Sequence, residues 1–336
     1  MTEFDHDSAS LPMMDDLPPV QPPSAGFIVQ LFLFPALIVM GVVAIWWMFG
    51  MIAVGEQDWR KLLSELQSQN LLIRNRAMYS LAQVLDQDSR WGDQGQKLRS
   101  NREIAQGLTD QLVIELRSNS TSKEGVAIQE FLTRALGMMD SLDVIAPALE
   151  SAMEPQRDPD VRKCAIVSLS YVAGRALERG QPLSNTQCVE ALVRISADPQ
   201  PVMRQSAAFA LGLFDSAEAK HQLEVLLESS DLMTGINAAI GLARQGSTHG
   251  FSVLRTALSD STIENTPETA EEFGDQFRIV KNSLKAVADL APKFDDQQKD
   301  ELIPHVEELA ANHPEMRIRI DAKAALNALN ASKKAP

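Results

Sequence analysis

The sequence predicts an all-α protein: an α-solenoid of about seven helix pairs, preceded by one transmembrane helix. Two observations lead to this prediction. The first is a recurring pattern in which an Arg is followed by an Ala three residues later and by a Leu four residues after that. Steps of three and four place side chains on one side of a helix, and their recurrence indicates similar helices that stack. The second is an apolar run near the N-terminus that is long enough to cross a bilayer.

The pattern occurs in four complete copies and in three weaker copies with the same spacing. The complete copies are Arg74, Ala77, Leu81; Arg162, Ala165, Leu169; Arg204, Ala207, Leu211; and Arg319, Ala322, Leu326. The weaker copies are Glu124, Ala127, Phe131; Gly235, Ala238, Leu242; and Lys281, Leu284, Ala288. An amphipathic stretch precedes each copy, at residues 59–66, 104–116, 144–153, 188–195, 221–227, 251–258 and 302–310. We therefore expect seven helix pairs, with the Ala at close helix contacts and the Leu in the core.

Turn residues precede the stronger copies. Residues 158–169 read DPDVRKCAIVSL, and residues 197–211 (ADPQPVMRQSAAFAL) and 313–326 (HPEMRIRIDAKAAL) follow the same order more loosely. A short carboxylate such as Asp158 favours a helix N-terminus, and a proline such as Pro159 ends one helix before the next begins. This motif resembles the HEAT-repeat family, an armadillo-type α-solenoid, over about residues 57–330. The resemblance implies an architecture but not an activity.

The four arginines of the complete copies need partners. Each lies at the start of its helix, where the helix dipole disfavours a positive charge. The HEAT resemblance implies that an Asp from an adjacent turn holds each Arg, so that a ladder links the repeats. Anion binding by Arg74, Arg162, Arg204 and Arg319 is the alternative.

Residues 27–54 are predicted to form the transmembrane helix, since Gln30 is the only strongly polar residue among them. If Pro35 marks the start of the regular helix, residues 36–54 still suffice to cross a membrane. A cleaved signal peptide is the alternative, but its apolar part is shorter and its start is basic, whereas this start is acidic. No Lys or Arg precedes the run, whereas Arg60 and Lys61 follow soon after it. This asymmetry predicts a single-pass membrane protein with a cytoplasmic solenoid and an external N-terminal tail.

The sequence also predicts the character of both termini and of two polar insertions. Residues 1–26 are acidic and proline-rich and are expected to be a disordered tail, in which residues 11–14 are a candidate docking motif. Residues 331–336 are expected to form a flexible C-terminus. Polar insertions at residues 87–101 and 260–272 are expected to project from one edge of the solenoid. Trp91 in the first insertion either packs back on the protein or anchors a partner.

Composition excludes several functions. Beyond residue 56 the chain has 39 acidic and 31 basic residues, and this excess argues against nucleic acid as a partner. Cys164 and Cys188 suggest neither a disulfide framework nor a metal site, and Cys164 is expected to be a small buried thiol. Glu301, His305 and Glu308 share a helix face, which a solvated surface explains better than a metal. We therefore predict no catalytic, cofactor-binding or metal-binding residues, no cofactor and no small-molecule substrate.

The function predicted on these grounds is a membrane-anchored scaffold that mediates protein–protein interaction and has no catalytic activity of its own. The binding residues and the partner's identity are not predicted. The alternative is an enzyme or enzyme subunit resembling the HEAT-like bilin lyases, which attach or detach tetrapyrroles. That alternative requires a pigment cavity and an acid–base pair, and neither has a signature in the sequence.

Overall fold

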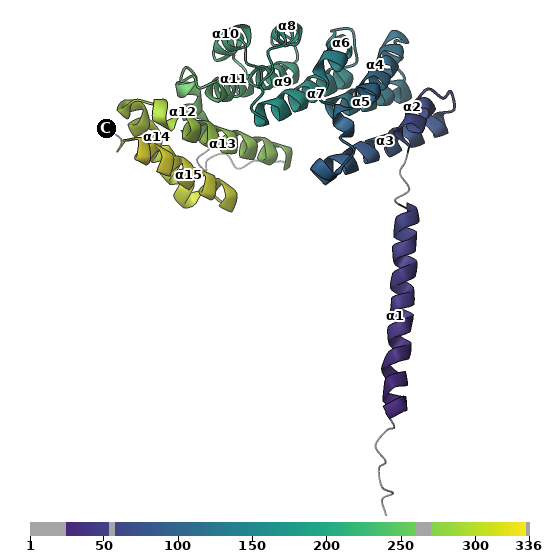
Figure 1. Cartoon of the computed structure of the whole chain (residues 1–336). Coiled ribbons are helices and arrows are strands. Elements are labelled where there is room, and N and C mark those ends of the chain that lie inside the picture. Colours follow the sequence, from purple (N-terminus) through teal and green to yellow (C-terminus); the bar gives the residue numbers. More distant parts are fainter. Residues whose placement is uncertain (1–24, 54–57, 260–269, 334–336) are drawn as a thin grey trace, which may run out of the picture. The chain divides into compact units, whose positions relative to one another are not determined.

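The computed structural model describes residues 25–53, 58–259 and 270–333 (Figure 1). The chain divides into two compact units, residues 1–57 and residues 58–336. The candidate docking motif at residues 11–14, the tail before residue 25 and most of the insertion at residues 260–272 lie outside the described residues.

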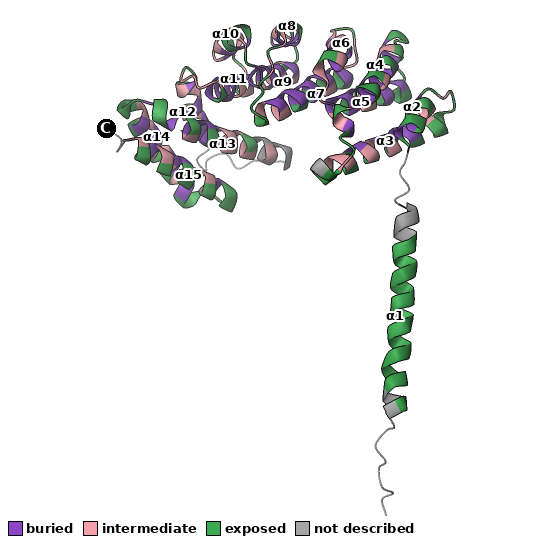
Figure 2. Ribbon diagram, in the orientation of Figure 1, coloured by how far each residue is buried: buried purple, intermediate pink, exposed green. Residues whose placement is uncertain are grey.

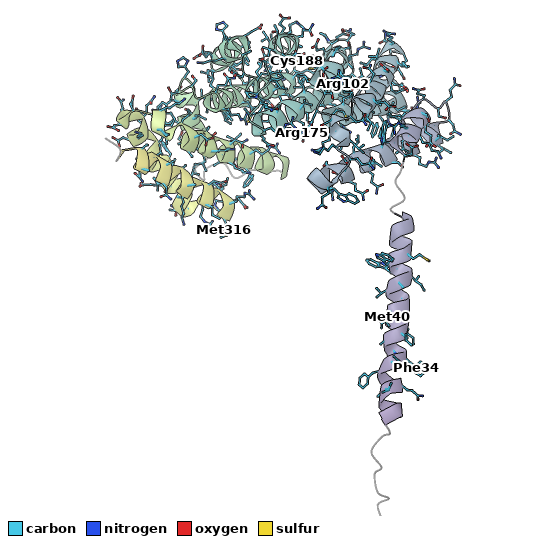
Figure 3. All side chains as sticks on the ribbon, viewed as in Figure 1. Phe34, Met40, Arg102, Arg175, Cys188 and Met316 are labelled. Atoms are coloured by element: carbon cyan, nitrogen blue, oxygen red, sulfur yellow. The ribbon has the colours of Figure 1, made fainter. Side chains whose placement is uncertain are left out.

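Helix α1 (Ala25–Ala53) forms the described part of the first unit. Pro35 lies inside this helix without ending it. The side chains of residues 29–48 are exposed and almost all apolar, as Phe34 and Met40 illustrate in Figure 3. The length and composition of α1 suit a membrane span, and a signal sequence near the N-terminus has the same properties. The predicted span of residues 27–54 differs slightly from α1, and residue 54 lies outside the described residues.

The second unit contains seven helix pairs in its described residues, as the repeated pattern predicts. The pairs are α2 (Trp59–Leu66) and α3 (Leu71–Trp91); α4 (Arg102–Arg117) and α5 (Lys123–Gly137); α6 (Leu142–Met153) and α7 (Pro159–Glu178); α8 (Thr186–Ile195) and α9 (Pro201–Leu211); α10 (Ala217–Leu226) and α11 (Leu232–Arg244); α12 (Phe251–Ser259) and α13 (Ala270–Leu290); α14 (Asp296–Asn312) and α15 (Met316–Lys333). Short 3-10 turns are η1 (Gly92–Gln94), η2 (Leu98–Ser100) and η3 (Ala291–Lys293). No strand occurs in these described segments, which contain one isolated bridge between Leu183 and Phe214. The all-α solenoid fold is therefore confirmed.

The C-terminal boundary differs from the prediction. We expected a flexible end from residue 331, but α15 continues to Lys333. Ala322, Ala325 and Leu329 of α15 are buried, and the Ser332 carbonyl accepts a hydrogen bond from Lys299 Nζ at 3.2 Å. These contacts hold the last turn of α15 against α14.

The helices form two layers, the first helices of the pairs in one and the second helices in the other (Figure 1). Capping residues set the helix starts: Asp158 accepts from the Asp160 backbone N–H, and Asn70, Asn101, Ser122 and Asn185 act in the same way. Asp198 belongs to the turn before α9, where it accepts from the Gln200 backbone N–H at 2.9 Å.

Buried residues lie where the two layers meet (Figure 2). One core cluster extends from α2 to α11 and a second from α11 to α15, so α11 contributes to both. Six of the seven middle positions of the pattern are fully buried, namely Ala77, Ala165, Ala207, Ala238, Leu284 and Ala322. Ala127 is exposed, so the predicted register is wrong in the second pair. Helix α5 instead buries Ile128, Leu132 and Leu136, and a shift of one residue turns a helix by about 100°.

Candidate functional site

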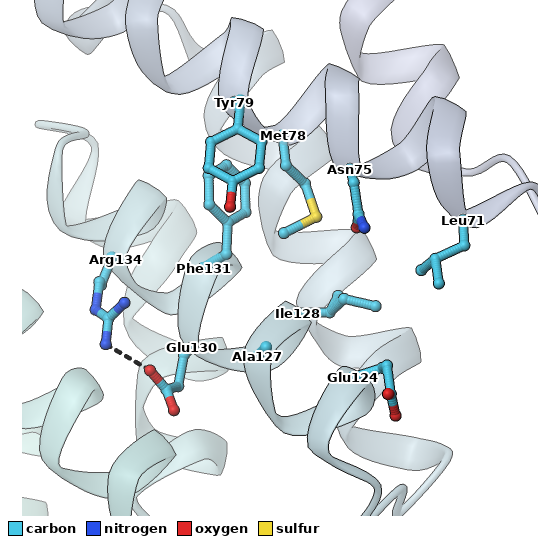
Figure 4. Close-up of a pocket in the computed structure, with 10 residues that line it drawn as sticks. All are labelled: Leu71, Asn75, Met78, Tyr79, Glu124, Ala127, Ile128, Glu130, Phe131 and Arg134. Atoms are coloured by element: carbon cyan, nitrogen blue, oxygen red, sulfur yellow. Dashed lines mark hydrogen bonds and ion pairs between the residues drawn. The ribbon is translucent and has the colours of Figure 1, made fainter.

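An apolar groove separates the second helices of the first two pairs. Helix α3 lines it with Leu71, Asn75, Met78 and Tyr79, and α5 lines it with Glu124, Ala127, Ile128, Glu130, Phe131 and Arg134 (Figure 4). The cavity volume is about 350 Å³. This volume lies at the lower end of the range for ligand pockets and suits one or two large side chains of a partner.

The groove opens because α3 and α5 do not pack along each other as the later second helices do. Between α5 and α7, a Cβ on Gly137 would lie 2.7 Å from the Ser168 Cβ. Between α9 and α11, a Cβ on Gly212 would lie 2.5 Å from the Gly241 Cα. Small residues therefore close these junctions. Helix α3 packs chiefly on α2, and large side chains face the space between α3 and α5.

The chemistry of the groove is apolar with a negative charge at its rim. Met78 and Ile128 are buried at its floor, whereas Tyr79 on its wall is 78% exposed. Glu130 and Arg134 form an ion pair on α5. Glu124 forms no ion pair within the described residues, so its carboxylate is the uncompensated charge. A side chain in the groove would meet an apolar wall and one carboxylate without an ion-pair partner.

The predicted Arg–Asp ladder is present at one junction. Arg162 on α7 forms a buried ion pair with Asp198 in the turn before α9, and Arg162 Nε donates to the Met153 carbonyl at 3.2 Å. Burial raises the pKa of Asp198, but the hydrogen bonds from Arg162 and from the Gln200 backbone lower it by a larger amount. The pKa of Asp198 is therefore below its ordinary value. Arg162 therefore has the structural role that the HEAT resemblance implies.

The other three arginines differ from the expected ladder. Arg74 Nη1 donates to Glu115 on α4 at 3.0 Å, so a Glu replaces the expected Asp. Arg204 Nη1 donates to the carbonyls of Asp198 and Pro199 at 2.9 and 3.0 Å. Arg319 makes the equivalent bonds to the carbonyls of His313 and Pro314, at 2.6 and 2.8 Å. Each Arg thus ties a helix to a turn or to the next pair, and no ladder runs the length of the solenoid.

The cysteines are free and have raised pKa values. Cys188 is fully buried on α8; its burial, together with the carboxylate of Glu150 3.8 Å away, raises its pKa to about 12. Cys164 on α7 is only half-buried, and burial raises its pKa despite the opposing effect of Arg134. Both thiols are therefore protonated at neutral pH.

The first polar insertion folds back through Leu98 rather than through Trp91. Asp88 accepts from the backbone N–H groups of Gln96 and Leu98, and Leu98 is buried. The Arg99 carbonyl accepts from the Asp140 N–H at 2.9 Å, which joins the insertion to the turn between α5 and α6. The Trp91 side chain at the end of α3 is 56% exposed, so it lies open to solvent.

The face of α14 that carries Glu301, His305 and Glu308 has protein partners. Glu301 pairs with Arg255 of α12 and also accepts from Gln297, and Glu308 accepts from Asn312 Nδ2 at 2.8 Å. Within the described residues, no cluster of three His, Cys, Asp or Glu side chains is placed to hold a metal ion.

One comparison with known proteins agrees with this architecture. A family model of HEAT repeats matches residues 189–272, which covers α8 to the start of α13, so the HEAT resemblance is confirmed over that stretch. A search of curated proteins found no match.

Solved structures similar to this chain include other repeat proteins. An archaeal HEAT-like repeats protein from Thermococcus onnurineus NA1 is 15% identical, with a TM-score of 0.46 and coverage of 82% of this chain and 98% of that one. The CpcE–CpcF complex of phycocyanin lyase from Nostoc sp. PCC7120 is 15% identical, with a TM-score of 0.44 and coverage of 82% and 95%. A designed armadillo repeat protein in complex with the peptide (KR)4 is 15% identical, with a TM-score of 0.39 and coverage of 82% and 100%.

Sequence reasoning missed the groove. Ala127 and Phe131 fit the repeated spacing and were therefore assigned to the core, and Tyr79 lies outside the repeated positions. A usable signal was present, because α5 also carries apolar residues at 128, 132 and 136, one position later than the pattern. Two adjacent apolar rows on one helix indicate that one of them faces something other than the core.

Proposed function

We propose that this protein is a membrane-anchored scaffold that binds a protein partner in the groove between α3 and α5. The observation that carries the proposal is the exposed apolar groove, in which Tyr79 and Phe131 stand on facing helices above a buried floor. An exposed aromatic side chain beside an apolar recess, as Tyr79 is here, is typical of protein-binding surfaces. The groove residues include no nucleophile and base pair, which favours binding over catalysis.

The anchor in this proposal is α1. Its apolar side chains are exposed, and its length is sufficient to cross the hydrocarbon core. The basic residues Arg60 and Lys61 follow it, and the preceding segment has none; this asymmetry supports a cytoplasmic solenoid with the N-terminal tail, residues 1–26, outside. The partner is thus held at a membrane surface.

A photo-crosslinking pair tests the groove. Benzoylphenylalanine replaces Ala127 in one full-length protein and Ala324, an exposed alanine in the middle of α15, in the other. Illumination of intact membranes should give a discrete protein adduct from position 127 and none from position 324. Ala127→Glu should remove the co-purifying partner, and Ala324→Glu should retain it. Equal adduct yields at positions 127 and 324, or equal partner recovery with the two Glu variants, would contradict the assignment of the groove.

Two fractionation experiments test the anchor. The full chain should stay with membranes after carbonate extraction and should retain α1, as measured by the intact mass. Protease added to intact cells should spare the solenoid. Release by carbonate, or a mass that lacks α1, would support a signal sequence, and external cleavage of the solenoid would reverse the orientation.

The enzyme alternative has a direct test. A bilin lyase or a related enzyme subunit would carry a pigment or cofactor, which absorbance and mass spectrometry of the purified chain would detect. Stoichiometric recovery of such a group would favour the enzyme over the scaffold.

A further inference from the structure

Helix α3 carries further exposed apolar side chains, beside those that line the groove. Leu72 and Ile73 do not line the groove, and the Leu72 side chain is 80% exposed. Arg76 lies one turn further along the same side, and its side chain is also largely exposed. We call Leu72, Ile73 and Arg76 the outer face of α3.

An exposed apolar face is unexpected in the first pair of a solenoid. Terminal repeats normally present a polar outer side, because no further repeat covers them. The last pair also exposes apolar residues, with Ile320 of α15 at 54%. The two ends of the solenoid therefore share apolar exposure, and other properties must distinguish them.

Charge is one such property. Residues 58–91 contain five basic and four acidic residues, whereas residues 295–333 contain five basic and eight acidic residues. The exposed cations Lys61 and Arg76 both lie beside the Glu65 carboxylate, at 4.0 and 3.2 Å, and Arg60 lies over the Trp59 ring. The first pair thus combines exposed apolar side chains with one more basic than acidic residue, whereas the last pair has an acidic excess, and an anionic bilayer surface attracts the first of these combinations.

The chain connection is the second property. Only residues 54–58 separate the end of α1 from the start of α2. Six Cα-to-Cα steps reach about 20 Å when fully extended. If α1 spans the membrane, the first pair is confined to the neighbourhood of the bilayer surface, and the last pair is not confined in this way.

We propose that the outer face of α3 lies in the interfacial layer of the bilayer, with Leu72 and Ile73 among the acyl chains and Arg76 at the headgroups. This inference rests on the proposed function in one respect, because it requires α1 to be the anchor. The contact orients the solenoid on the membrane.

The test uses the full chain in vesicles of phosphatidylcholine with phosphatidylserine as the minor lipid. Benzoylphenylalanine replaces Leu72 in one protein and Ile320 in its matched control, since both are exposed apolar residues of a terminal second helix. After illumination, mass spectrometry should find a lipid adduct at position 72 in several-fold higher yield than at position 320. Equal yields, or a protein adduct at position 72 in place of lipid, would overturn the inference.

Two controls separate the possible failures. Thermal unfolding of each variant establishes that the replacement leaves the solenoid folded, and Ile73 is the alternative position if Leu72 does not tolerate it. Carbonate extraction of the same vesicles tests α1 alone. A retained protein without a lipid adduct overturns the outer-face inference only, whereas an extracted protein overturns the proposed anchor.

Discussion

The junction between α3 and α5 and the junction between α9 and α11 are built from the same repeat, yet one is open and the other is closed. Gly212 and Gly241 let the backbones of α9 and α11 approach until no side chain fits between them. Met78, Tyr79 and Phe131 occupy the corresponding space between α3 and α5, and a groove remains. The difference teaches that a repeated core pattern sets the layers, whereas the residues beside that pattern decide whether neighbouring repeats touch.

The inter-repeat ion pairs also differ between the two regions, since Arg162–Asp198 is more deeply buried than Arg74–Glu115. Loss of these pairs should have the largest effect on the free energy of unfolding. Asp198→Ala leaves Arg162 buried without its partner and should lower the free energy of unfolding by about 3 to 5 kcal/mol. Glu115→Ala at the open end should cost less, about 1 to 3 kcal/mol, because the Arg74 side chain is partly exposed. Urea unfolding of residues 58–336, which have their own core, compares them. A larger cost for Glu115→Ala would contradict the comparison.

Substitution of Ala by the larger Leu should destabilise the protein at buried helix contacts but not in the open groove. Ala165→Leu and Ala207→Leu add volume at fully buried sites and should each cost about 1 to 3 kcal/mol. Ala127→Leu has the same chemistry but faces the groove, so its effect should stay within about 0.5 kcal/mol. Thermal melting of the three variants is the measurement. A large cost for Ala127→Leu would mean that the groove is closed in solution.

A glycine substitution examines the closed junction between α9 and α11 more finely, and a second one on α7 serves as its control. Gly212→Ala would place its Cβ 2.5 Å from the Gly241 Cα and should cost about 1 to 2 kcal/mol. Gly174→Ala on α7 meets nothing within 4 Å and should stabilise the protein by about 0.5 to 1 kcal/mol through helix propensity. Opposite signs in the melting temperatures are expected. The same sign for both would show that α9 and α11 separate to accept a methyl group.

The smallest effect concerns pH. The pKa of Asp198 is lower in the folded state than its ordinary value, so its ionised form contributes stability above the unfolded-state pKa of about 4. This contribution is lost as the pH falls through the folded-state pKa. Asp198→Asn should therefore reduce the loss of stability on acidification. Urea midpoints measured as the pH is lowered from neutral compare this variant with the parent, and an equal loss in both would contradict the prediction.

Sequence periodicity predicted the fold well because it reports which side of a helix is buried. The spacing of Arg162, Ala165 and Leu169 located a second helix, and the same spacing found all seven. The second pair shows where the method fails. Glu124, Ala127 and Phe131 have the required spacing, but Ile128 and Leu132 are the residues that α5 buries. Spacing alone does not choose between two apolar rows on one helix, since both rows satisfy the same period.

Local sequence by itself determined the helices, their order and their caps. It also determined that an apolar helix precedes the repeats, because composition decides these features within a few residues of chain. Tertiary structure alone decided which partner each repeat arginine has, and that α3 and α5 stand apart. Those outcomes depend on the distance and angle between helices that lie some 40 residues apart in the chain, as with Arg74 and Glu115. Packing between repeats sets that geometry, and no single helix encodes it.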